Sequence, residues 1–92
     1  MPLSELEDVL RSRRAEPQAG SYTSELLADP ERLQRKVMEE AFELCLELGR
    51  AELSHERIAE EAADLVYHVL VGLIGAGVAW ADVLAVLQER RK

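Results

Sequence analysis

The strongest constraint on the fold of this chain is a pair of long helical segments separated by a short turn. Asp29 can cap a helix over residues 30–48, whose first position holds a proline, and Gly49 is a typical stop. Ser54 is a typical N-cap for a second helix that runs to about residue 76. Because so short a connection keeps the two helices adjacent, we expect them to pack antiparallel.

Shorter helical segments flank this pair. Residues 4–7 have the sequence of a capping box, and apolar residues at helical spacing extend that helix to about Arg14. Residues 15–20 indicate a loop, and the hydroxyl cluster that follows can start a short helical turn through Leu27. A last helix covers roughly residues 80–90, although Ala79 stands where a capping side chain is expected.

No segment shows the alternation of apolar and polar residues that is typical of a strand. The sequence therefore predicts an all-α bundle of about four helices, formed by one domain over residues 1–92.

Composition bounds the partners of this domain. Hydrophobic residues make up 48% of the 92 residues, which is more than one small helical domain needs and favours an interface with another subunit. The formal net charge is −7 and no Lys/Arg-rich face is evident. Binding to nucleic acid through phosphate neutralisation is therefore not expected.

The chain also lacks sequence signals for export or membrane insertion. A single cysteine, Cys45, allows no intramolecular disulfide, and the N-terminus has no signal-peptide layout. The longest apolar stretch, residues 69–81, is too short to span a bilayer. We expect a soluble cytoplasmic protein without a membrane partner.

Acidic side chains on the two long helices form a constellation with chemical meaning. Glu40 and Glu43 are spaced at i, i+3 on the first, and Glu61 and Asp64 repeat that spacing on the second. The two pairs lie at mirrored distances from the turn and should come level. Four carboxylates in one cleft repel, and a hard divalent cation resolves the repulsion. Mg²⁺ prefers such oxygen ligands, Mn²⁺ can replace it, and either lets an acidic protein hold phosphates.

The alternative is an ordinary solvated surface. Glu-rich helix faces are common, and Arg32, Lys36 and Glu40 can form simple i, i+4 ion pairs. Spacing alone leaves both interpretations open.

Two runs of residues in this region resemble a known family. Residues 36–43 followed by residues 60–68 resemble the EExxE and ExxD motifs of the MazG-like all-helical nucleotide pyrophosphohydrolases. Within that superfamily the chain is most similar to the phosphoribosyl-ATP pyrophosphatase family. The similarity extends to residues 21–23 upstream, to residues 64–68 and to residues 77–84 near the C-terminus.

The resemblance implies a MazG-like fold and hydrolysis of 1-(5-phosphoribosyl)-ATP to 1-(5-phosphoribosyl)-AMP and pyrophosphate in histidine biosynthesis. It implies that a Mg²⁺-bound water attacks between the α- and β-phosphorus. By motif position the Mg²⁺ ligands would be Glu40, Glu43, Glu61 and Asp64, with Glu39 as an alternative ligand. The resemblance further implies a homodimer whose subunits complete the cleft together.

Substrate contacts are assigned to a further set of side chains, most of which the resemblance alone singles out: Lys36, Ser21, Tyr22, Thr23, His68 and Arg14. Each has a structural alternative. Lys36 can simply pair with Glu40, and the hydroxyl residues can be helix caps. His68 can be a structural hydrogen-bonding residue that lines the cleft, and Arg14 can be a solvated helix end. Cys45 lies on the apolar side of its helix and is expected in the core.

Three functions remain to be separated. The first is hydrolysis of phosphoribosyl-ATP. The second is a housekeeping pyrophosphohydrolase for noncanonical nucleoside triphosphates, with the same metal chemistry and another base pocket. The third is a non-catalytic helical dimerisation module with solvated acidic faces.

Overall fold

The structure, a computed structural model that describes residues 2–91, is all-α over that range. Its helices are α1 (Leu3–Ala15), α2 (Tyr22–Leu27), α3 (Pro30–Leu48), α4 (His55–Ala76) and α5 (Trp80–Glu89). The predicted fold class is confirmed. The count is five because the hydroxyl cluster closes into a short helix, α2, whose Ser21 Oγ accepts a hydrogen bond from the Ser24 N–H.

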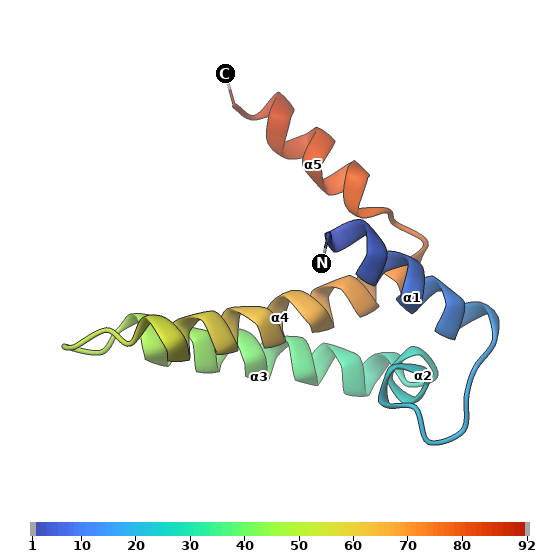
Figure 1. Ribbon diagram of the computed structural model, residues 1–92, viewed down its shortest axis with the longest axis horizontal. Coiled ribbons are helices and arrows are strands. Elements are labelled where there is room, and N and C mark those ends of the chain that lie inside the picture. The colour runs from blue at the N-terminus through green and yellow to red at the C-terminus, as the bar shows by residue number, and fades with distance from the viewer. Residues whose placement is uncertain (1, 92) are drawn as a thin grey trace.

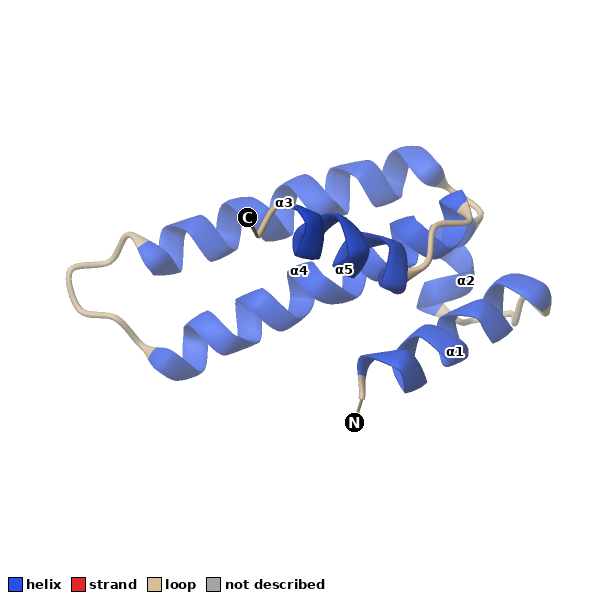
Figure 2. Ribbon diagram, turned by 90° about the horizontal axis from the view of Figure 1, so that it is seen from above, coloured by secondary structure: helices blue, strands red, loops and turns tan. Residues whose placement is uncertain are grey.

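The long helices α3 and α4 lie side by side and antiparallel, as predicted (Figures 1 and 2). In Figure 1, α2 lies across one end of this pair, α1 packs along the same end of α4, and α5 projects away from the bundle. Asp29 and Ser54 cap α3 and α4 as expected, accepting from the N–H groups of Arg32 and Arg57. Gly77 ends α4 with φ +78°, a left-handed conformation that glycine adopts without strain.

The capping box predicted at Ser4 is wrong. Helix α1 already begins at Leu3, with Pro2 as its uncapped N-cap, so Ser4 lies inside the helix. Leu3 packs against the core, which favours the earlier start. Glu7, the expected box partner, turns inward instead, and its Oε2 accepts from the Trp80 N–H at 2.8 Å.

The same contact explains how α5 begins without a capping side chain at Ala79. Glu7 serves the Trp80 N–H, and Asp82 Oδ2 accepts from the Ala79 N–H at 3.1 Å. Two carboxylates, one from α1 and one from α5 itself, thus satisfy N–H groups that the helix leaves free.

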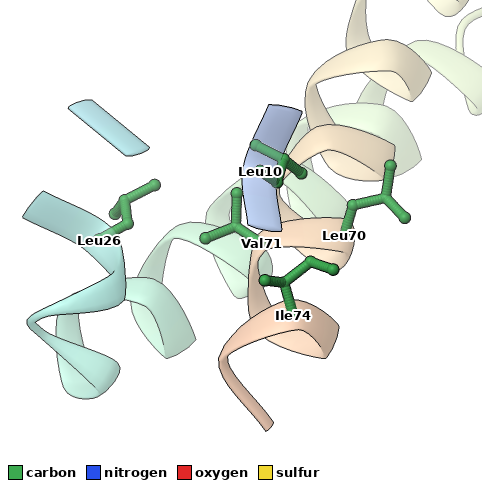
Figure 3. Close-up of a cluster of buried hydrophobic side chains, with 5 residues drawn as sticks. All are labelled: Leu10, Leu26, Leu70, Val71 and Ile74. Atoms are coloured by element: carbon green, nitrogen blue, oxygen red, sulfur yellow. The ribbon is translucent and has the colours of Figure 1, made fainter. Parts of the chain in front are cut away.

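The hydrophobic core sits around the C-terminal half of α4. Figure 3 shows side chains from α1, α2 and α4 converging there: Leu10, Leu26, Leu70, Val71 and Ile74. Cys45, predicted in this core, is instead exposed on α3. The core ends before it reaches that part of α3, and Leu46 beside it is exposed as well.

Several large apolar side chains remain exposed on α3 and α5, among them Met38, Phe42, Leu46, Leu84, Val86 and Leu87. No buried residue lies on α5. No single helix within residues 2–91 is both long and apolar enough to cross a membrane. Only α4 and α5 taken together meet that length and composition, and they are bent by 104° relative to each other.

Candidate functional site

Three carboxylates meet where α3 and α4 face each other. Glu40 and Glu43 on α3 and Glu61 on α4 each offer one oxygen, and these atoms lie within 4.8 Å of one another. Glu40 and Glu61 are buried, whereas Glu43 is exposed. The two helices therefore bring most of the predicted constellation level. Asp64, the fourth predicted ligand, is exposed on α4 and is not among these three.

The two buried carboxylates are only half satisfied. The Oε1 atom of Glu40 lies 3.4 Å from Lys36 Nζ, and that of Glu61 lies 2.8 Å from Arg57 Nη2. Their Oε2 atoms are buried and have no hydrogen-bond partner within residues 2–91. Leaving a buried polar atom unpaired costs about 1–3 kcal/mol of stability, and the cost is higher when the group is charged. Two unpaired oxygens beside the Glu43 carboxylate fit a bound divalent cation, which takes oxygen ligands of this kind.

The electrostatics of the cluster agree with that fit. The negative charge of Glu40 raises the pKa of Glu43, and Glu61 and partial desolvation raise it further against the opposing charge of Lys36. The three carboxylates therefore crowd like charges where α3 and α4 meet.

Lys36 links the carboxylate cluster to Glu39. Its Nζ lies 3.3 Å from Glu39 Oε2 as well as 3.4 Å from Glu40 Oε1. The contact with Glu39 is the main cause of the raised pKa of Lys36, to which Glu40 and Tyr22 add against partial desolvation. Glu39, which the sequence predicted as an alternative ligand, is exposed and pairs with Lys36 rather than joining the three carboxylates.

Both ring nitrogens of His68 form hydrogen bonds within the protein. Its Nδ1 lies 2.7 Å from the Asp64 carbonyl oxygen, which only accepts, so Nδ1 carries the proton. In the neutral ring Nε2 then accepts from the Tyr22 hydroxyl at 2.8 Å. His68 is also buried, at 6% exposure, so this geometry favours a structural role.

Of the remaining hydroxyl residues, Thr23 takes part in the same contact between α2 and α4, whereas Ser21 makes a local contact within α2. Thr23 Oγ1 hydrogen-bonds the Tyr67 hydroxyl, and Ser21 caps α2. The Arg32 guanidinium lies over the Tyr22 ring, 5.5 Å from its centroid. Tyr22 thus lies between His68 and the guanidinium of Arg32, a residue that the sequence motifs did not single out for binding.

Arg14 lies elsewhere. It lines a separate pocket of about 490 Å³ at the corner between α1, α4 and α5, together with Arg11 and Ile74. At about 1.5 Å per residue, Ile74 is roughly 20 Å along α4 from Glu61. Arg14 is therefore not brought to the carboxylates of its own chain.

Sequence reasoning missed Arg57, which forms the shortest ion pair among the described residues, at 2.8 Å to Glu61. The signal was present as a repeated spacing: residues 36–40 read K-x-x-E-E and residues 57–61 read R-x-x-E-E. It also missed Glu47, a buried carboxylate that accepts two hydrogen bonds from Arg50, at 3.0 and 3.1 Å. These bonds lower the pKa of Glu47.

Comparison with known proteins places this arrangement in a family context. The family described as Phosphoribosyl-ATP pyrophosphohydrolase matches residues 3–91. A phosphoribosyl-ATP pyrophosphatase of Pyrobaculum arsenaticum is 48% identical over 98% of this chain and 95% of its own length. The corresponding protein of Methanosphaerula palustris is 43% identical over 98% of this chain and 92% of its own length. A histidine biosynthesis bifunctional protein of Prochlorococcus marinus is 41% identical over 97% of this chain, which spans only 39% of that relative.

Proposed function

Because this chain belongs to the phosphoribosyl-ATP pyrophosphohydrolase family, we propose that the carboxylate cluster between α3 and α4 hydrolyses 1-(5-phosphoribosyl)-ATP with the help of Mg²⁺. Water adds to the α-phosphorus, the α–β anhydride bond breaks, and the products are 1-(5-phosphoribosyl)-AMP and pyrophosphate. The reaction belongs to histidine biosynthesis, and the catalytic unit is one cytoplasmic domain over residues 1–92. The observation that carries the proposal is the pair of unpaired, buried oxygens on Glu40 and Glu61 beside Glu43.

The side chains divide the work by charge. Glu40, Glu43 and Glu61 would hold the cation, and Asp64, one turn beyond Glu61 on α4, would be the fourth ligand. When bound, Mg²⁺ neutralises phosphate charge and polarises the attacked phosphorus, and Mn²⁺ can replace it.

The surroundings of the cluster orient the substrate. Lys36 lies at the edge of the carboxylate group, 30% exposed at its side chain, so its ammonium can meet a phosphate without leaving Glu40. Tyr22 and Arg32 lie on the same side of α3 as Lys36 and supply an aromatic ring and a second cation. His68 acts through Tyr22, since its Nε2 accepts a hydrogen bond from the Tyr22 hydroxyl.

The active form in this proposal is a homodimer. A stripe of exposed apolar side chains at i, i+4 spacing runs along α3 through Met38, Phe42 and Leu46. A groove of about 630 Å³ between α2, α3 and α4 is lined mainly by apolar residues, including Leu33 and Gly72. A second copy that covers these surfaces can also bring its own Arg14 to the substrate. Sedimentation of Phe42→Glu tests the interface: the proposal expects a monomer, and an unchanged species would contradict it.

The test of activity is pyrophosphate release from phosphoribosyl-ATP, measured with Mg²⁺ beside a panel of ordinary and noncanonical nucleoside triphosphates. We expect release from phosphoribosyl-ATP alone, abolished by EDTA and by Glu43→Gln. Glu31→Gln, a change at an exposed position of α3, is the matched control and should retain activity.

The other outcomes separate the alternatives. Release from the nucleoside triphosphates instead would keep the metal site and assign the chain to housekeeping hydrolysis. A folded dimer that releases pyrophosphate from no substrate would favour the non-catalytic dimerisation module.

A further inference from the structure

Two matching groups of charged residues, one on each long helix, flank the cluster of Glu40, Glu43 and Glu61. On α3, Lys36 contacts Glu39 at 3.3 Å and Glu40 at 3.4 Å. On α4, Arg57 contacts Glu60 at 3.5 Å and Glu61 at 2.8 Å. Each group is therefore a cation that reaches one exposed carboxylate three residues ahead and one buried carboxylate four residues ahead.

The match extends to individual oxygen atoms. In both buried carboxylates Oε1 contacts the cation of the same helix, and Oε2 is the buried atom without a partner. Both side chains are 9% exposed, so neither carboxylate is held by solvent. A carboxylate fixed at one oxygen loses most of its rotational freedom and presents the other oxygen in one direction.

We propose that Arg57 is a positioning residue for Glu61: it fixes Oε1 so that Oε2 points to the cation, as Lys36 does for Glu40. This inference rests on the proposed function, since it requires that Glu61 is a metal ligand. Residues that orient metal ligands in this way commonly contribute about tenfold or more to metal affinity.

Arginine is suited to this task. Its planar group reaches Glu60 through Nη1 and Glu61 through Nη2 at the same time, which fixes the orientation of the fork. Its side chain is 51% exposed, so the charge stays in contact with solvent and needs little desolvation.

A simple counter-ion would have the opposite effect on metal binding. A positive charge that only balances Glu61 repels an arriving cation, so its removal would tighten binding. Removal of a positioning residue weakens binding because Glu61 is no longer held. The sign of the change in metal affinity therefore separates the two roles.

The experiment measures the affinity of the purified protein for Mn²⁺ and Mg²⁺ by calorimetry, without substrate. Four variants are compared with the wild type: Arg57→Gln, Arg57→Lys, Glu61→Gln and Arg35→Gln. The last is the matched control, because Arg35 forms an exposed i, i+4 pair with Glu31 at 3.0 Å on α3. Circular dichroism confirms that each variant keeps its helices.

We expect Arg57→Gln to weaken binding of both ions about tenfold, Arg57→Lys to recover most of the loss, and Arg35→Gln to bind as the wild type does. Glu61→Gln should abolish binding. If Arg57→Gln binds the ions as tightly as the wild type or more tightly, and Glu61→Gln still does not bind them, the positioning role is overturned and the proposed function stays intact. Equal binding by the wild type and Glu61→Gln would overturn both.

Discussion

The two halves of α4 do opposite things with the same helical geometry. Toward its N-terminus the helix buries one side chain, the carboxylate of Glu61, and the imidazole of His68 is buried just past the midpoint. Toward its C-terminus it buries only hydrocarbon, through Leu70, Val71 and Ile74. Both halves are therefore interior, but only one of them has a packed apolar core from neighbouring helices (Figure 3).

The difference teaches where stability and chemistry reside. Fully burying an aliphatic side chain stabilises the fold by about 1.5–3 kcal/mol, and α1 and α2 supply the partners for that burial. The carboxylate half packs against α3, keeps unpaired oxygens and crowds like charges. A site of this kind lowers stability in return for function, so changes that remove activity need not unfold the protein.

The largest expected effect belongs to the apolar half. Leu70→Ala removes a side chain that is 1% exposed and should lower the free energy of unfolding by about 2–5 kcal/mol. Urea denaturation measures it, and Leu53→Ala, at a position 57% exposed, is the control with little change. A loss below about 1 kcal/mol would contradict the assignment of stability to this half.

The second effect belongs to the carboxylate half. Glu61→Gln should reduce pyrophosphate release by at least about 100-fold, which is about 2.7 kcal/mol or more in barrier height. The free energy of unfolding should change by less than about 1 kcal/mol, because the lost ion pair has a half-exposed arginine. Glu56→Gln, at an exposed position in the first turn of α4, should keep its activity. Unfolding of Glu61→Gln to the extent seen for Leu70→Ala would erase the distinction between the two halves.

A smaller effect should appear at the boundary between the halves. Tyr22→Phe leaves His68 Nε2 buried without its donor and should lower the free energy of unfolding by about 0.5–1.5 kcal/mol. Nitrogen NMR of His68 should show Nδ1 protonated in the wild type. A ring protonated on Nε2 would show that the assigned direction of the hydrogen bond is wrong.

The smallest expected effect is a pH dependence within the carboxylate half, measured on metal-free protein. The pKa of Glu43 is raised above its usual 4.5, so the folded state holds more protons than the unfolded state. Stability should therefore fall as the pH rises from about 4.5 through the folded pKa, and Glu43→Gln should remove that slope.

Glu47 should show the opposite pH dependence of stability. Arg50 lowers its pKa below the usual 4.5, so its contribution is present above that value and is lost as the pH falls through the folded pKa. Glu47→Gln should reduce the loss of stability in acid and leave the slope above pH 4.5 in place. A slope above 4.5 that survives Glu43→Gln would contradict the crowding of charges at the cluster.

The sequence was informative wherever the signal is local. The bounds of α3 agree with the prediction because Asp29, Pro30 and Gly49 act on adjacent backbone groups. The i, i+3 spacing of Glu40 and Glu43 follows from the helical period, and the short turn brings Glu61 level with them. The predictions from the sequence were wrong at Ser4 and Cys45. The first depended on Glu7 reaching α5, and the second on how far the core extends along α3.

By itself, then, the sequence determined the helices, their antiparallel pairing and the stripe of carboxylates, because each depends on residues a few positions apart. Only the tertiary structure decided which oxygens stay unpaired, that Asp64 stands outside the central three, and that Tyr22 meets His68 across 46 positions. The physical reason is that the rotation of α4 about its axis is set by the packing of Leu70, Val71 and Ile74 against α1 and α2. That rotation fixes where every polar side chain on the other half of α4 points.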